Sequence, residues 1–139
     1  MTQWMVLTAL VVALSSAAPA TGQESATCPL TGQIAMTQAE LFFGLSIKGR
    51  GPVTPREWRT FTADTLTRTF PLGFTVYDST GQWMDPARHR VVSERSKVVL
   101  VVADNPGLAD KLMAVARVYK TRFRQQSVGI VTRPVCASF

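Results

Sequence analysis

The stretch V-V-S-E-R-S-K-V-V-L-V-V-A, residues Val91 to Ala103, decides the fold of this chain. From Val98 onward every residue of the stretch is apolar. Because a strand turns alternate side chains to opposite faces of a sheet, an unbroken apolar run predicts a strand that is covered on both faces. In the first half, Glu94 and Ser96 share one face of the strand, and Arg95 and Lys97 share the other. We therefore predict a central strand with one polar end.

A strand and a helix are predicted before this central strand. Apolar residues alternate from Leu41 to Ile47, which is typical of a strand, and the sequence G-R-G-P then breaks the pattern. The sequence T-P-R-E that follows is a helix start signal. Thr54 can cap the first turn, Pro55 suits the first helical position, and Glu57 can complete a capping box. The helix should end before Pro71.

The remaining elements follow in the same way. Residues 74–83 read as a strand and residues 85–90 as a loop, so we predict a hairpin with the central strand. Asn105 and Pro106 then repeat the signal of a cap followed by proline. Apolar side chains at helical spacing predict one buried face of a second helix: Leu108, Leu112, Val115, Tyr119 and Phe123. Residues 127–132 read as the last strand.

This order of elements predicts an α+β fold, a ferredoxin-like βαββαβ sandwich. Right-handed crossovers give a four-stranded antiparallel sheet with two helices on one face, in which the first and third strands are central. The other face would expose Phe42 and one alternating set of the residues from Val98 to Val102. An exposed apolar patch of this kind usually marks an interface. We predict a homodimer packed sheet to sheet, or a pocket lined by the open face.

The first residues predict export. Residues 1–20 have an apolar run from Trp4 to Leu14 and then small residues, as in a secretory signal peptide cut after Ala20 or Gly22. The run is too short for a transmembrane anchor, which needs about 20 apolar residues. Residues 21–38 read as a flexible lead-in and residues 39–139 as a single α+β domain. We predict a periplasmic or secreted location.

Export would place the two cysteines in a compartment where they can form a disulfide. Cys28 lies near the start of the mature chain and Cys136 near its end. In an oxidising compartment an even number of cysteines favours pairing. A bridge that closes so long a loop contributes up to about 4–5 kcal/mol in the chain-entropy model. The alternative is two buried free thiols.

Charge gives a second candidate partner. The net charge is +6, and all fifteen Lys and Arg residues follow residue 47. Outside the cytoplasm, a basic domain meets anionic lipids, polyanionic saccharides or acidic proteins. Arg117, Lys120 and Arg124 have the spacing of one helix face and are our candidates for contact with an anionic surface. The alternative is a solvated face.

Several spaced motifs resemble one known family. They are Leu41-Phe42-Phe43-Gly44, Trp58-x-x-Phe61, Phe70-Pro71-x-Gly73-x-Thr75-Val76, Gly81-Gln82-Trp83, Glu94-x-Ser96-Lys97, Tyr119 and Phe123-x-Gln125-x-Ser127-Val128. Together they resemble short secreted bacterial proteins catalogued as a domain of unknown function, three-five-seven-four. Phe42 departs from the family pattern, which has Tyr there. The resemblance implies a leader, one compact domain and bacterial export, and it transfers no catalytic residue.

The best candidate site is the polar end of the hairpin. Glu94 and Ser96 share one strand face, and Gln82 and Trp83 lie across from them, so the four are our candidates for binding a polar small ligand. A buried Glu94 could act as a general base. The alternative is structural: Glu94 pairs with a nearby Arg, Gly81 permits a bulge, and Trp83 caps the edge of the core.

Other chemistries lack support in the sequence. His89 is the only histidine and has Arg on both sides, which argues against a metal site or a serine triad. No phosphate-binding glycine motif is present, and the third strand lacks the stacking aromatics of RNA-recognition modules. We predict no cofactor, no metal and no nucleic acid. The leading hypothesis is a non-enzymatic envelope protein that binds a small ligand or an envelope protein through its open sheet face. The alternatives are a cofactor-free enzyme with Glu94 as base and electrostatic attachment to anionic surfaces.

Overall fold

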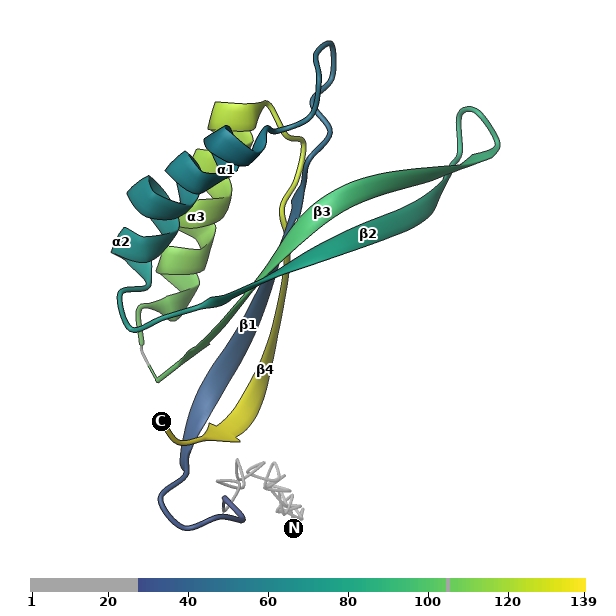
Figure 1. Ribbon diagram of the computed structural model, residues 1–139. Coiled ribbons are helices and arrows are strands. Elements are labelled where there is room, and N and C mark those ends of the chain that lie inside the picture. Colours follow the sequence, from purple (N-terminus) through teal and green to yellow (C-terminus); the bar gives the residue numbers. More distant parts are fainter. Residues whose placement is uncertain (1–27, 105) are drawn as a thin grey trace, which may run out of the picture.

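The computed structural model describes residues 28–104 and 106–139, and its centre is a four-stranded antiparallel sheet. The strands are β1 (Ile34–Gly44), β2 (Thr75–Asp85), β3 (Arg90–Ala103) and β4 (Gly129–Ala137), in the order β2-β3-β1-β4. The helices lie together on one face (Figure 1). The predicted ferredoxin-like α+β fold is therefore confirmed, with β1 and β3 in the centre of the sheet.

The first helical segment begins at the predicted capping box. Thr54 Oγ1 accepts a hydrogen bond from the Glu57 backbone N–H at 3.2 Å, and the Glu57 carboxylate accepts one from the Thr54 N–H at 2.8 Å. The segment consists of α1 (Pro55–Phe61), a π-helical turn η1 (Thr62–Leu66) and α2 (Thr67–Thr69). The π-helical turn brings Phe61 and Leu66, five positions apart, to the same buried side.

The second helix, α3 (Leu108–Phe123), packs the predicted face against the sheet. All five apolar residues expected on that face are buried. The N-cap residue is Gly107, and Asn105, the predicted cap, lies outside the described residues. The helix ends at Arg124, which adopts the left-handed conformation that commonly closes a helix.

An aromatic cluster joins the helices to the sheet. The Tyr119 ring lies 4.7 Å from Phe43, 5.0 Å from Phe61 and 4.7 Å from Phe123 between ring centroids. Trp58 closes the cluster on the α1 side, 5.6 Å from Phe43. The Tyr119 hydroxyl donates a hydrogen bond of 2.8 Å to the Gly44 carbonyl, so the core also holds the last residue of β1.

Two strands differ in length from the sequence prediction. β1 begins at Ile34, so residues 34–38 of the expected flexible lead-in belong to the sheet and pair with β4. The sequence did not predict this pairing, because the few apolar residues of this segment do not form a buried face. β4 continues to Ala137 through Pro134, which a strand tolerates at the edge of a sheet because no outer neighbour needs its missing N–H.

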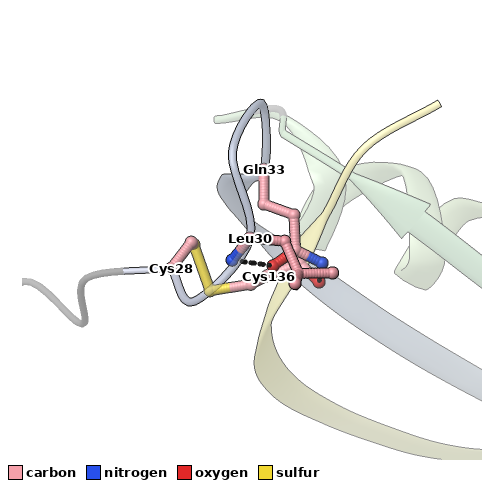
Figure 2. Close-up of a disulfide and its surroundings, with 4 residues drawn as sticks. All are labelled: Cys28, Leu30, Gln33 and Cys136. Atoms are coloured by element: carbon pink, nitrogen blue, oxygen red, sulfur yellow. Dashed lines mark hydrogen bonds between the residues drawn. A yellow bond between two sulfur atoms is a disulfide. The ribbon is translucent and has the colours of Figure 1, made fainter.

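The predicted disulfide is present. Cys28 and Cys136 are joined by an S–S bond, with their Cα atoms 5.5 Å apart (Figure 2). Beside the bond, Gln33 Nε2 donates to the Cys136 carbonyl at 3.4 Å, and Gln33 Oε1 accepts from the Leu30 N–H at 3.3 Å. The predicted signal peptide lies outside the described residues. Within residues 28–104 and 106–139, no helix has the length and apolar composition to cross a membrane.

Candidate functional site

The strand register assigns every strand side chain to one of two faces. Leu41 pairs with Val99, and both are fully buried against the helices. Their neighbours Phe42 and Val98 also pair and point the opposite way. We call that uncovered side the open face. It comprises even-numbered residues of β1 and β3 and odd-numbered residues of β2 and β4. The alternating set left open by the sequence analysis is thus Val98, Leu100 and Val102.

The open face is apolar outside residues 80–95 of the β2–β3 hairpin. Its large apolar residues there are Ile34, Met36, Phe42, Tyr77, Val98, Leu100, Val102, Val131 and Val135. Phe42 is 38% exposed, Tyr77 51% and Val131 54%. Outside residues 80–95, Glu40 and Arg133 are the only charged residues on the open face of the described sheet, and they lie 3.9 Å apart between Oε1 and Nη2. The face is therefore apolar and close to neutral, although the chain is basic.

The four residues predicted to form a ligand site do not share one face. Glu94, Ser96 and Trp83 point to the open face, because Trp83 pairs with Val92 and Ser96 with Ser79. Gln82 pairs with Ser93 and points to the helix side. The prediction that Gln82 and Trp83 face the same site was wrong, because neighbouring residues of a regular strand point to opposite faces.

The Glu94 side chain has a structural partner. Its Oε1 accepts a hydrogen bond from the Ser46 backbone N–H at 2.9 Å, just beyond the end of β1. A Cβ atom at Gly44 would lie only 2.9 Å from Oε1. The Glu94 carboxylate therefore fits in this position because residue 44 has no side chain. The partner is thus a backbone amide where the structural alternative expected an arginine. A general base at Glu94 stays a prediction.

Trp83 lies on a projecting part of the hairpin. Residues 80–95, which we call the hairpin arm, pair mainly with each other, because β1 pairs with β3 only from Ser96 to Ala103. Figure 1 shows the arm reaching away from the helices. Trp83 is 46% exposed there, so it does not cap the core edge, and Gly81 pairs with Glu94 in an unbroken ladder without a bulge.

A cavity lies on the helix side of β3. A groove of about 800 Å³ opens between α1, the segment 45–53 and the base of the hairpin arm. Buried apolar residues contribute to its lining, namely Leu45, Ile47, Val53 and Trp58. Four basic residues line it as well: Arg50, Arg59, Arg95 and Lys97. The sequence analysis missed this site, although it placed Arg95 and Lys97 together on one face of β3.

Two of the four basic residues are paired. Arg50 Nη2 binds both carboxylate oxygens of Glu57, at 2.9 and 3.0 Å, and Lys97 Nζ binds Asp78 Oδ1. A hydrogen bond from the Thr54 backbone, followed by the one from Arg50, lowers the pKa of Glu57. The hydrogen bond from Lys97 lowers the pKa of Asp78. Within residues 28–104 and 106–139, Arg59 and Arg95 form no ion pair.

The predicted basic surface on α3 is only partly assembled. Arg117 and Lys120 line a shallow depression of about 440 Å³ between α3 and β4, whereas Arg124 is the left-handed C-cap residue and does not line it. His89 has a positive φ of 47° in the turn of the hairpin arm. Within the described parts of the chain, no three His, Cys, Asp or Glu side chains are grouped to hold a metal ion.

Residues that carry the family resemblance meet at the end of β1. Tyr119 binds the Gly44 carbonyl, Glu94 binds the Ser46 N–H, and Gln125 Nε2 donates to the Ser46 carbonyl at 2.6 Å. A family model for proteins of unknown function, DUF3574, matches residues 38–139. The chain belongs to the DUF3574 family. The resemblance predicted from the spaced motifs is thereby confirmed. A comparison with curated proteins gives no significant match.

Solved structures share the fold of this DUF3574 protein. A phage SAM lyase in complex with S-methyl-5'-thioadenosine matches at a TM-score of 0.56 with 14% identity, over 75% of this chain and 90% of that one. The apo state of a phage SAM lyase matches at a TM-score of 0.54 with 14% identity, over 75% and 86% of the two chains. The B. subtilis GlnK–ATP complex matches at 0.49 with 14% identity, over 76% and 84%. At 14% identity the likeness to the two SAM lyase structures concerns the fold alone.

Proposed function

We propose that this DUF3574 protein is a non-enzymatic binding module whose open face packs against the open face of a second copy. One observation carries the proposal: the sheet has an apolar face that no part of the described chain covers. Water contact with so many apolar side chains is unfavourable by about 25 cal/mol for each Å². A face of this kind usually belongs to an interface.

The size of the open face suits a dimer. β1 has eleven residues, which at about 3.3 Å each span about 36 Å. β2, β3 and β4 add eleven, fourteen and nine residues, and neighbouring strands lie about 4.8 Å apart. Summed over the four strands, the sheet face measures about 700 Å², close to the ~800 Å² that each partner contributes to a standard stable interface.

The charge of the open face also favours a second copy as the occupant. Two molecules that each carry a net charge of +6 repel each other over most of their surfaces. On the open face outside residues 80–95 the repulsion is weak, because Glu40 and Arg133 form a local pair and no other charge is present among the described residues there. An acidic protein partner would find more attraction elsewhere on this basic chain.

The oligomeric state tests this proposal. Size-exclusion chromatography with light scattering, supported by native mass spectrometry, should show a dimer. Val131→Lys adds a positive charge beside the Glu40–Arg133 pair, so that two open faces with a net positive charge would have to pack together. The variant should weaken the dimer at least about tenfold. Val91→Lys is the matched control. Val91 is 53% exposed and Val131 54%, but Val91 points to the opposite face.

The expected control result is an unchanged dimer with native circular dichroism. A wild-type protein that stays monomeric at all concentrations would overturn the proposal. Equal weakening by the two lysine variants would also count against it, because the effect would then follow from charge alone and not from the face.

We also propose that the protein is exported to the bacterial periplasm or beyond. The support is the Cys28–Cys136 disulfide, since structural disulfides persist in oxidising compartments. Mass spectrometry of the protein from its own envelope fraction tests this, with a mature N-terminus after Ala20 or Gly22 as the expected result. A full-length chain recovered only from the cytoplasm would contradict the proposal.

A further inference from the structure

The groove beside α1 combines two properties that are unusual on a protein surface. Its walls include buried apolar residues, among them Trp58 and Val53, and its four charged lining residues are all basic. A cavity of about 800 Å³ falls in the range of small-molecule sites, which are mostly apolar with a few polar groups. A site with apolar walls and basic lining residues fits a ligand that has an apolar part and a negatively charged group.

Two guanidinium groups of the groove remain available for a ligand. Arg59 comes from α1 and Arg95 from β3, and neither forms an ion pair within the described residues. Their neighbours Arg50 and Lys97 have carboxylate partners, Glu57 and Asp78, that do not line the groove. Arg is suited to this task because its planar group binds carboxylate or phosphate through two parallel hydrogen bonds.

The groove is also fixed in shape by hydrogen bonds that its lining residues form. Ser46, on its wall, is held at its N–H by Glu94 and at its carbonyl by Gln125. The start of α1 is held by the capping box between Thr54 and Glu57. Val53 N–H donates to the Leu45 carbonyl at 2.8 Å, which closes the segment between β1 and α1. A preorganised wall reduces the entropy lost when a ligand binds.

We propose that this groove binds a small organic anion, with an apolar body against Trp58 and Val53 and a carboxylate or phosphate group held by Arg59 and Arg95. This site is separate from the proposed dimer face. Arg95 pairs with Thr80 and points to the helix side, whereas the open face lies on the other side of β3. The two proposals can therefore fail independently.

Two probes test the chemistry of the ligand, and each has a control. Phenylacetate and phenyl phosphate carry the two possible anionic groups on the same ring. Phenylacetamide keeps the ring without the charge, and inorganic phosphate keeps the charge without the ring. Binding is measured by isothermal titration calorimetry on the disulfide-bonded protein. Quenching of Trp58 fluorescence in a background with Trp4→Phe and Trp83→Phe, which leaves Trp58 as the one tryptophan, reports whether the probe enters the groove.

We expect saturable binding of one or both aromatic anions and at least tenfold weaker binding of phenylacetamide and inorganic phosphate. Arg59→Gln and Arg95→Gln should each weaken binding about tenfold or more, since each removes charge-assisted hydrogen bonds. The matched controls are Arg56→Gln on α1 and Arg90→Gln on β3, neither of which lines the groove. Both should change affinity less than about twofold.

Three results would overturn the proposal. One is the absence of saturable binding of either anion. Another is equal affinity for phenylacetate and phenylacetamide, which would show an apolar site without charge recognition. The third is a loss in the Arg56 and Arg90 variants as large as that in the groove variants, which would indicate general electrostatic attraction. Circular dichroism and the elution volume of each variant establish that it is folded, so that a loss of affinity reports on the groove.

Discussion

Replacement of Tyr119 by phenylalanine should destabilise the protein by an amount that depends on pH. The Tyr119 side chain is fully buried, and its hydroxyl donates a 2.8 Å hydrogen bond to the Gly44 carbonyl. The variant keeps the ring contacts with Phe43, Phe61 and Phe123 but leaves the carbonyl without this donor. A buried hydrogen bond of this kind contributes about 0.5–1.5 kcal/mol, and an unsatisfied partner raises the loss toward about 3 kcal/mol.

The pH dependence follows from the pKa of the phenol. Burial, followed by the negative charges of Glu94 and Glu57, raises the pKa of Tyr119 above its ordinary value near 10. In the unfolded chain the phenol titrates near pH ~10. The folded state thus keeps a proton that the unfolded state loses, so this stabilising contribution is complete below pH ~10 and falls as the pH rises further. The fall is about 1.4 kcal/mol for each pH unit.

Urea unfolding of the two proteins at several pH values measures this effect. At neutral pH the midpoint of Tyr119→Phe should lie about 0.25–1.5 M below that of the wild type, for an m value of about 2 kcal/mol per M. Between pH ~10 and ~11 the difference in free energy of unfolding should shrink, because only the wild type loses the phenol contribution. Equal midpoints at neutral pH, or a difference that grows above pH ~10, would refute this reasoning.

Further predictions concern the disulfide, the hairpin residues Glu94 and Trp83, and the basic surface of α3. Reduction of the Cys28–Cys136 bond should lower the free energy of unfolding by about 2–4 kcal/mol, measured by urea unfolding with and without reductant, and an unchanged midpoint would contradict a stabilising role. Glu94→Gln should lower the free energy of unfolding by about 1 kcal/mol or less through its weakened bond to the Ser46 N–H, while Trp83→Ala, on the exposed arm, should leave the domain folded. An unfolded Trp83→Ala protein would contradict this placement of Trp83. Retention on anionic vesicles, if Arg117 and Lys120 bind them, should disappear in about 0.5 M salt through screening, and retention that persists in salt would argue against electrostatic attachment.

The elements that could be predicted from sequence have local causes. The Thr54 capping box, the buried face of α3 and the apolar run of β3 each depend on residues a few positions apart, and each is present in the structure. The π-helical turn that brings Phe61 and Leu66 together has no comparable local signal. In an ordinary α-helix residues five positions apart lie about 140° apart around the axis, so the wider turn depends on the burial of both side chains in the core. The early start of β1 at Ile34 depends on pairing with β4, almost a hundred residues away.

The candidate site was predicted less well, because it depends on contacts distant in sequence. Alternation alone requires Gln82 and Trp83 to face opposite ways, but only the register of the hairpin tells which of them joins Glu94. The groove requires in addition that the segment 45–53 fold over the helix side of β3. The sequence did show that the basic residues Arg95 and Lys97 share one face of β3. It could not show that this face borders a groove, because the groove also needs the segment 45–53.

The alternation of β3 connects the two proposals. Ser96, Val98 and Leu100 point to the open face, whereas Arg95 and Lys97 point to the groove. A second copy on the open face would leave the groove accessible, because the groove lies on the helix side of β3 and the open face on its other side. The shared element is the end of β1, where Tyr119 on the helix side and Glu94 on the open side hold Gly44 and Ser46 in place. Packing at this strand end therefore supports the groove wall and the border of the open face together.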